Sequence, residues 1–140
     1  MAHWLFKSEP EKWSWEMQKA AGKNGQQWDG VRNYQARNNM RAMQIGDRGF
    51  FYHSNEGKEV VGIVEVCALA HPDTTTDDPR WECVDLRAVK DMPKPVTLED
   101  IKANERLAQM VLVNNSRLSV QPVSDAEWTE VCRMGGLKGE

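Results

Sequence analysis

The sequence contains no long hydrophobic run. The apolar stretch nearest its start, Trp4–Phe6, is too short for the core of a secretory signal. A membrane-spanning helix needs roughly eighteen or more consecutive apolar residues, and the chain has no such segment. We therefore expect a soluble, cytoplasmic protein with no membrane partner.

Cysteine and histidine are also scarce. The three cysteines, Cys67, Cys83 and Cys132, are widely spaced and include no C-x-x-C pair, so neither a disulfide framework nor a zinc site is indicated. The histidines are too isolated along the chain to suggest a metal site, and there is no glycine-rich phosphate-binding loop. We expect buried thiols in a reducing compartment, with no metal and no cofactor.

Positive charge is not in excess. The formal net charge is -3, which argues against a broad electrostatic grip on duplex nucleic acid. The charge is uneven, however: residues 28–55 contain four arginines and two aspartates, whereas residues 73–105 contain nine acids and five basic side chains. Only the first of these segments could face nucleic acid, although such a small surplus is also common on a solvated helix.

The 140 residues predict a single domain, 1–140, of the α+β class. Alternation, helix caps and glycine or proline punctuation predict a mixed, mostly antiparallel sheet with flanking helices, curved into a small barrel whose mouth could hold one ligand. The expected strands are 3–7, 48–54, 60–69, 81–89 and 118–120; the expected helices are 14–21, 34–44, a short one opening at Thr97, and one from Ser124 to Met134; residues 22–27 read as a polar loop and 55–58 as a hairpin turn.

Residues 28–38 carry the richest mixture of recognition groups. This segment, WDGVRNYQARN, combines an indole, a phenol, two guanidiniums and several side-chain amides. Aromatic rings stack on bases, amides pair with base edges, and arginine binds phosphate. The alternative is an ordinary loop leading into an amphipathic helix, with Trp28 and Tyr34 as core anchors.

Lys7, Ser8 and Glu9 lie at the end of the first expected strand. They offer an amine, a hydroxyl and a carboxylate, the groups of a nucleophile and its base. In an extended strand, Lys7 and Glu9 share one face and Ser8 takes the other, so either the pair or the serine enters a pocket. A solvated Lys/Glu pair is the simpler interpretation.

Two more strand ends present polar groups. His53 and Ser54 close the strand from Arg48, where a histidine could bind a ligand or simply satisfy a neighbour. Arg117 and Ser119 fall on one face of the short strand before Pro122, so they would deliver a cation and a hydroxyl to the same side, unless this is only a surface edge. The other tryptophans read as core residues.

Taken in order, several segments resemble the EVE domain family, which is related to the PUA, YTH and ASCH domains. Each segment alone is a weak signal, but the ordered set spans almost the whole chain. The matching segments are Trp4–Pro10 (WLFKSEP), Trp28–Asn38 (WDGVRNYQARN), Gly46–Asp47 with Phe51–Ser54 (FYHS), Gly62–Val66 (GIVEV) and Arg117–Val123 (RLSVQPV).

The resemblance implies a PUA-like fold and a pocket that accepts a base, especially a modified one, flipped out of DNA or RNA. It implies a binding module with no chemistry of its own. We also expect a monomer. Carried over by motif, the ligand-binding residues would be Ser8, Trp28, Gly30, Arg32, Asn33, Ala36, His53, Ser54, Arg117 and Ser119. With Ser8 directed inward, strand alternation would turn Lys7 and Glu9 outward.

Two other functions remain open at this point. Some ASCH proteins resemble this scaffold and hydrolyse acylated cytidine with Lys, Thr and Glu, so Lys7 and Glu9 could serve an amidohydrolase. The third alternative is a protein-interaction domain with an incidental pocket.

Overall fold

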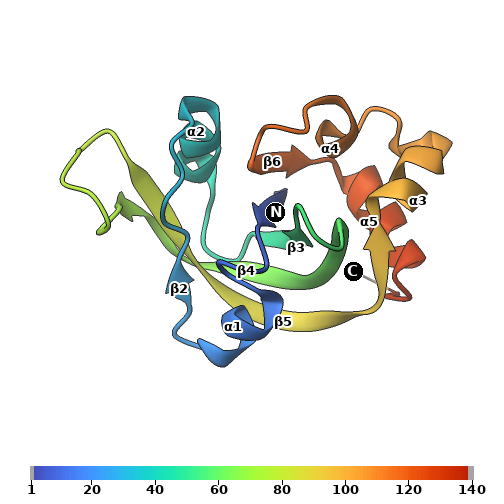
Figure 1. Cartoon of the computed structure of the whole chain (residues 1–140), viewed down its shortest axis with the longest axis horizontal. Coiled ribbons are helices and arrows are strands. Elements are labelled where there is room, and N and C mark those ends of the chain that lie inside the picture. Colours follow the sequence, from blue (N-terminus) through green and yellow to red (C-terminus); the bar gives the residue numbers. More distant parts are fainter. Residues whose placement is uncertain (1, 139–140) are drawn as a thin grey trace.

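The computed structural model describes residues 2–138, in which a long bent sheet is flanked by helices (Figure 1). The elements in chain order are β1 (His3–Ser8), α1 (Trp15–Ala20), β2 (Gln26–Gln27), α2 (Tyr34–Ala42), β3 (Arg48–His53), β4 (Glu59–Pro72), β5 (Glu82–Thr97), α3 (Leu98–Ala103), the 3-10 turn η1 (Glu105–Leu107), α4 (Val111–Asn114), β6 (Val120–Val123) and α5 (Asp125–Met134).

The six strands form one sheet in the order β2-β5-β4-β3-β1-β6. Only β1 and β3 pair in parallel, and every other neighbouring pair is antiparallel. The mostly antiparallel α+β class is confirmed. The prediction of a closed barrel is wrong. Within the described residues, β2 and β6 are the two edges of the sheet and do not pair with each other. β2 has two residues and β6 has four, too few for a ladder that would close the sheet.

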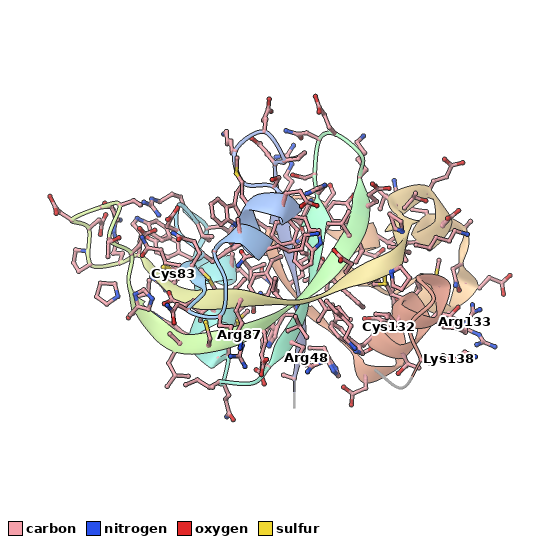
Figure 2. All side chains as sticks on the ribbon, turned by 90° about the horizontal axis from the view of Figure 1, so that it is seen from below. Arg48, Cys83, Arg87, Cys132, Arg133 and Lys138 are labelled. Carbon is pink, nitrogen blue, oxygen red and sulfur yellow. The ribbon has the colours of Figure 1, made fainter. Side chains whose placement is uncertain are left out.

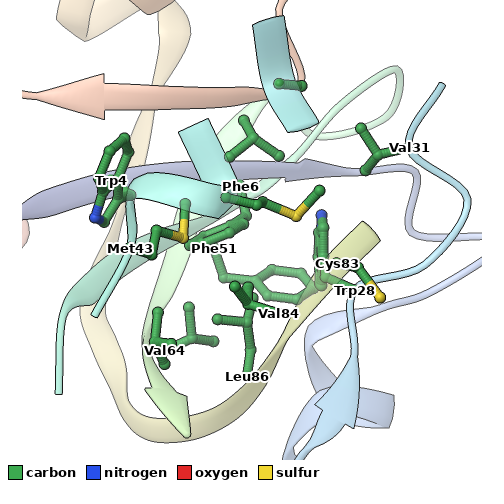
Figure 3. Close-up of a cluster of buried hydrophobic side chains, with 14 of the residues drawn as sticks. Trp4, Phe6, Trp28, Val31, Met43, Phe51, Val64, Cys83, Val84 and Leu86 are labelled. Carbon is green, nitrogen blue, oxygen red and sulfur yellow. The ribbon is translucent and has the colours of Figure 1, made fainter. Parts of the chain in front are cut away.

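Alternation along the strands divides the buried side chains between two cores. Trp4 and Phe6 of β1 enter one core and Leu5 enters the other. The α2 core gathers Trp4, Phe6, Trp15, Trp28, Ala36, Met40, Met43, Phe51, Val64, Leu86 and their neighbours (Figure 3). The α5 core gathers Leu5, Phe50, Tyr52, Ile63, Met92, Ile101, Leu107, Trp128, Val131, Cys132 and their neighbours.

The helix starts follow the predicted caps. The side chains of Ser14, Thr97 and Ser124 accept backbone N–H groups at the first turns of α1, α3 and α5, and Ser124 forms a reciprocal capping box with Glu127. The three predicted helices are confirmed. Their starts can be predicted from the sequence because a cap depends only on residues within one turn of the helix.

Three strand predictions need correction. The expected loop 22–27 contains β2, which pairs with β5. The strand predicted to end at Val89 continues to Thr97, since Pro93 and Pro95 lie in a bulge between the pairs Gly62–Asp91 and Val60–Val96, where no ladder donor is needed. The strand expected at 118–120 is β6, which contains Pro122; as an edge strand it tolerates a residue that has no N–H.

None of the three cysteines forms a disulfide. Cys83 belongs to the α2 core and Cys132 to the α5 core, and they lie in opposite halves of the molecule (Figure 2). Burial raises the pKa of the Cys83 thiol to about 12, which makes it inert. Among residues 2–138, no three metal-ligating side chains come together, and no helix is long and apolar enough to cross a membrane.

Candidate functional site

A cavity of about 480 Å³ opens where the end of β1 meets the segment that precedes α2. This volume lies within the usual range of small-ligand sites, about 300–1,000 Å³. Three chain segments supply the lining: Lys7, Ser8, Glu9, Lys12 and Trp13 from β1 and the turn after it, Gln26 to Arg32 from β2 and the following loop, and Ser119 from the residues just before β6.

Backbone hydrogen bonds fix the β1 side of the cavity. The Lys7 N–H donates to the Ser119 carbonyl at 2.9 Å, and the Ser54 N–H donates to the Ser8 carbonyl at 2.8 Å. The Ser8 hydroxyl donates to the Trp13 carbonyl at 2.5 Å, which leaves its oxygen free only to accept. Lys7, Ser8 and Ser119 are therefore held together although they come from opposite ends of the chain.

Trp28 is a wall of the cavity and a member of the α2 core at once. Its ring makes edge contacts with Phe6 at 5.5 Å and Phe51 at 5.6 Å between centroids (Figure 3). Its backbone N–H donates to the Val84 carbonyl at 2.8 Å. The indole is only 7% exposed, so it can offer a rigid surface to a ligand.

Asp73, in the loop between β4 and β5, clamps the segment that follows Trp28. Its carboxylate accepts the Gly30 N–H at 2.9 Å and the Arg32 guanidinium at 3.0 Å, as well as the backbone N–H and hydroxyl of Thr75. Burial favours the neutral acid, but these donors prevail and lower the pKa of Asp73 to about 2. Gly30 has a φ of +79°, a conformation that side-chain-bearing residues rarely adopt.

The remaining charged groups of the cavity differ in how they are paired. Glu9 and Lys12 form an ion pair at 3.1 Å. The Lys7 ammonium contacts the Ser116 carbonyl, and partial burial lowers the pKa of Lys7. Burial, reinforced by the charge of Asp73, raises the pKa of Asp29. The site thus contains one amine and one carboxyl whose charged forms are both disfavoured by partial burial, although Asp29 is an exposed residue and also accepts a hydrogen bond from Gln27.

Of the residues expected to bind ligand, five line this cavity together: Ser8, Trp28, Gly30, Arg32 and Ser119. They come from three separate segments, and the fold brings them to one place. Arg32 is less available than expected, because its guanidinium is held by Asp73.

The other five expected residues lie outside the cavity lining, where each has a visible structural role or an exposed position. The Asn33 side chain caps α2 by accepting the Ala36 N–H at 2.9 Å, and Ala36 itself is fully buried. The Nε2 of His53 accepts the Trp15 N–H at 3.1 Å, and burial lowers the pKa of His53. Ser54 supplies the backbone N–H to Ser8, and Arg117 is exposed. Their part in binding stays a prediction.

The expectation that Lys7 and Glu9 turn away from the site is wrong, since both line the cavity beside Ser8. For Glu9 the reason is that β1 ends at Ser8 and the chain turns, so strand alternation no longer applies. Lys7 lies within β1 opposite Tyr52, with its ammonium 5.9 Å from the centre of the Tyr52 ring, and it lines the cavity from the end of the strand.

Sequence reasoning also missed half of the lining. Asp29 and Val31 lie inside the segment already identified as the richest one and could have been included with it. Gln26 and Gln27 were hidden in an expected loop, because a strand of two residues has no periodicity. Trp13 and Lys12 carry no signal in the sequence that separates them from surface or core residues.

Comparison with known proteins gives consistent results. Residues 2–134 match the family model described as the EVE domain. Thymocyte nuclear protein 1 from Homo sapiens is 37% identical over 91% of this chain and 71% of its own length. A protein from Agrobacterium tumefaciens of known structure is 68% identical and covers 100% of this chain and 97% of that one, with a TM-score of 0.98.

Two further solved structures place the fold more widely. The human THYN1 protein in complex with DNA containing 5-methylcytosine is 35% identical, covers 100% of this chain and 99% of that one, and gives a TM-score of 0.91. The YTH domain of a Zygosaccharomyces rouxii protein covers 99% of this chain and 87% of that one, with a TM-score of 0.58 at 15% identity, which shows a shared fold only.

Proposed function

The chain belongs to the EVE domain family, and from that premise we propose that its cavity binds a modified base flipped out of DNA or RNA. In this proposal Trp28 provides the stacking surface, while Ser119 and the charged groups around it contact the edge of the base. The domain binds and does not catalyse.

The single observation that carries the proposal is the cavity itself. Its lining combines the rigid indole of Trp28, a second tryptophan, Trp13, and polar groups of both kinds. Lys7 offers hydrogen-bond donors and Asp29 offers acceptors. Proteins that read extruded bases use the same combination, in which an aromatic face stacks on the ring and polar groups pair with its edge.

The electrostatics fit recognition through a base rather than through the backbone. The chain carries a formal net charge of -3, and Arg32, the cation nearest to the Trp28 wall in sequence, is neutralised by Asp73. Few phosphates can then be bound, so most of the affinity must come from the base in the cavity. An unpaired or poorly stacked base costs least to extract.

The relatives support the same proposal. The human THYN1 structure contains DNA with 5-methylcytosine, and it superimposes on the whole of this chain with a TM-score of 0.91. A modified DNA base is therefore the first ligand to test, with RNA probes as the second. The expected cytoplasmic location and monomeric state stay predictions.

Fluorescence anisotropy with short labelled oligonucleotides tests the proposal. Single strands and duplexes carrying one 5-methylcytosine are compared with the same sequences carrying cytosine, and a parallel series uses modified RNA bases. We expect preferential binding to a modified probe and a shallow salt dependence, equivalent to about two or three phosphate contacts at a slope near -0.9 each on duplex. Tight, steeply salt-dependent binding to every duplex would contradict the proposal.

One observation favours a second candidate, an amidohydrolase acting on acylated cytidine. Lys7 and Glu9 both line the cavity, and burial lowers the pKa of Lys7, as a base would require. Against it, Glu9 is paired with Lys12, and no threonine is found among the described lining residues to complete a Lys, Thr and Glu set.

Chromatography of N4-acetylcytidine incubated with the purified protein separates the two candidates. Under the binding proposal the nucleoside is recovered intact. Release of cytidine by the parent protein, abolished in a Lys7→Ala, Glu9→Ala double variant, would establish the enzyme and overturn the binding-only function.

A further inference from the structure

Asp29 differs from the other carboxylate of the cavity. Two acidic side chains line it, Glu9 and Asp29. Glu9 is neutralised by Lys12 at 3.1 Å, whereas no ion pair of the described residues involves Asp29, whose carboxylate accepts a hydrogen bond from the Gln27 side chain. Arg32 acts on Asp29 only at long range, because its guanidinium is bound to Asp73.

The backbone on both sides of Asp29 is anchored. The preceding residue, Trp28, donates its N–H to Val84 at 2.8 Å, and the following residue, Gly30, donates its N–H to Asp73 at 2.9 Å. Asp29 is therefore held next to the indole wall on a fixed backbone, as precise recognition requires. A base stacked on Trp28 would bring its edge close to this carboxyl group.

The chemistry of the group determines what it can read. An ionised carboxylate only accepts hydrogen bonds, so it favours a base that presents an N–H donor and repels one that presents a carbonyl oxygen. Asp29 is exposed, so a ligand in the cavity can reach its carboxylate. Partial burial raises its pKa, and a hydrogen-bond donor on the ligand would favour the charged form. Lys7, a donor only, lines the same cavity and suits an acceptor on the same base edge.

We propose that Asp29 selects bases carrying an exocyclic amino group beside a ring-nitrogen acceptor, which are cytosine, adenine and their methylated forms, over bases that carry a carbonyl at that position. The inference rests on the proposed function of the cavity and adds the residue that sets base identity. Asp29 accepts from the amino group, while Lys7 donates to an acceptor of the same base.

Matched pairs of probes test this edge of the base. 5-Methylcytosine and thymine share the ring methyl group and differ at position 4, amino against carbonyl, and at N3, acceptor against N–H donor; adenine and hypoxanthine differ in the same way at position 6 and N1. Each base is placed at the centre of an otherwise identical single-stranded oligonucleotide, so that differences in base-pair strength do not enter. We expect the parent protein to bind the amino member of at least one pair about tenfold more tightly, within the range for one good edge contact.

The variant Asp29→Asn removes the charge while keeping the shape, and its amide can both donate and accept. We expect it to bring the affinity ratio within the discriminated pair close to one, whereas the control Glu11→Gln, at an exposed carboxylate outside the cavity lining, keeps the parent ratio. Melting curves verify that both variants are folded. Should Asp29→Asn fail to fold, equal affinity of the parent protein for both members of both pairs still overturns the inference.

The outcomes separate the inference from the function on which it rests. Equal affinity of the parent protein for both members of both pairs, or an unchanged ratio in Asp29→Asn, overturns the role of Asp29 and leaves base binding intact. Absence of binding to any modified or unmodified probe overturns the proposed function and this inference with it. Discrimination in only one pair assigns the site to pyrimidines or to purines.

Discussion

The two cores pack against the same strands, but only the α2 core contains residues that line the candidate cavity. In the α5 core, the ring of Trp128 is sandwiched between His3 at 4.3 Å and Phe50 at 4.0 Å, both nearly parallel to it. Trp128 is 2% exposed and lines neither cavity of the described residues. The hollow on this side, of about 760 Å³, lies outside the core and is lined almost entirely by polar groups of α3, η1 and α5: Asp100, Ala103, Asn104, Glu105, Arg106, Glu130 and Arg133. This core is a stacked aromatic interior beneath α5, whose place at the edge of the sheet is seen in Figure 1.

The α2 core is built around indoles whose polar edges have partners. The N–H of Trp4 donates to Asp47 at 3.1 Å, and the N–H of Trp15 donates to Asp91 at 2.7 Å. Its third buried indole, Trp28, reaches the cavity. The difference teaches that packing alone does not locate the proposed site: the cavity adjoins the core in which aromatic rings meet polar groups at the surface.

Trp128→Ala gives the largest expected effect. Removing a fully packed indole from a core typically costs about 3–5 kcal/mol of folding free energy. Urea denaturation measures this loss. Because Trp128 does not line the cavity, the fraction that remains folded should bind ligand like the parent. A large loss of affinity in that fraction would show that the α5 core contributes to ligand binding.

Trp28→Ala should lower both stability and binding, since this residue belongs to the core and to the cavity. We expect ligand affinity to fall by roughly 1–3 kcal/mol, the range for one base-stacking aromatic. Thermal melting and anisotropy of the same sample separate the effects. If stability falls while the folded fraction keeps its affinity, the indole is structural and the stacking role fails.

Asp73→Asn tests the clamp on the cavity loop. The folded pKa of about 2 against an ordinary 3.8 corresponds to about 2 kcal/mol of stability, present above about pH 4 and lost as the pH falls through about 2. We expect the variant to be less stable at pH 7 by about this amount and to approach the parent near pH 2. Urea titrations across this pH range provide the measurement.

Glu130 of α5 provides the internal comparison for that experiment. Arg133 and Asn104 lower its pKa to about 2, so the α5 side has an acid-sensitive carboxylate of its own. Both proteins retain Glu130, so its contribution cancels in the difference between their curves. A difference that does not change with pH would show that the charge of Asp73 does not stabilise the loop.

Ser119→Ala should have the smallest effect. We expect it to weaken ligand binding by about 1 kcal/mol, the value of one hydrogen bond, and to leave the melting temperature unchanged. Ser116→Ala, a change at an exposed serine outside the cavity lining, is the matched control. Equal affinities for the two variants would remove Ser119 from the contact surface.

The features that the sequence predicts correctly are those set by neighbouring residues. The caps at Ser14, Thr97 and Ser124 give three helix starts, and the turn around Gly57 marks the hairpin between β3 and β4. Prediction fails for strands whose existence or length depends on pairing with distant parts of the chain. β2 is too short to have a period, and the prolines of β5 are tolerated only because the strand bulges around them.

The site follows the same division. Trp28, Gly30 and Arg32 are predictable as members of one distinctive segment, and Ser8 and Ser119 come from the resemblance to the family. The hydrogen bonds from Gly30 and Arg32 to Asp73 are not predictable, because they depend on a loop 43 positions after Gly30 that folds back onto it. The place of Trp13 in the cavity lining also depends on tertiary contacts and could not be predicted.

The position of β1 has a consequence for when the site comes into existence. β1 lies between β3, its parallel neighbour, and β6, and the side chain of Lys7 contacts the carbonyl of Ser116, 109 residues further along the chain. Contacts of such long range form late, since closing a large loop is entropically costly. A growing chain on the ribosome has already released its first strand long before the partners of that strand are made. The cavity is therefore complete only when synthesis has passed β6, and we expect no shorter nascent chain to bind the proposed ligand.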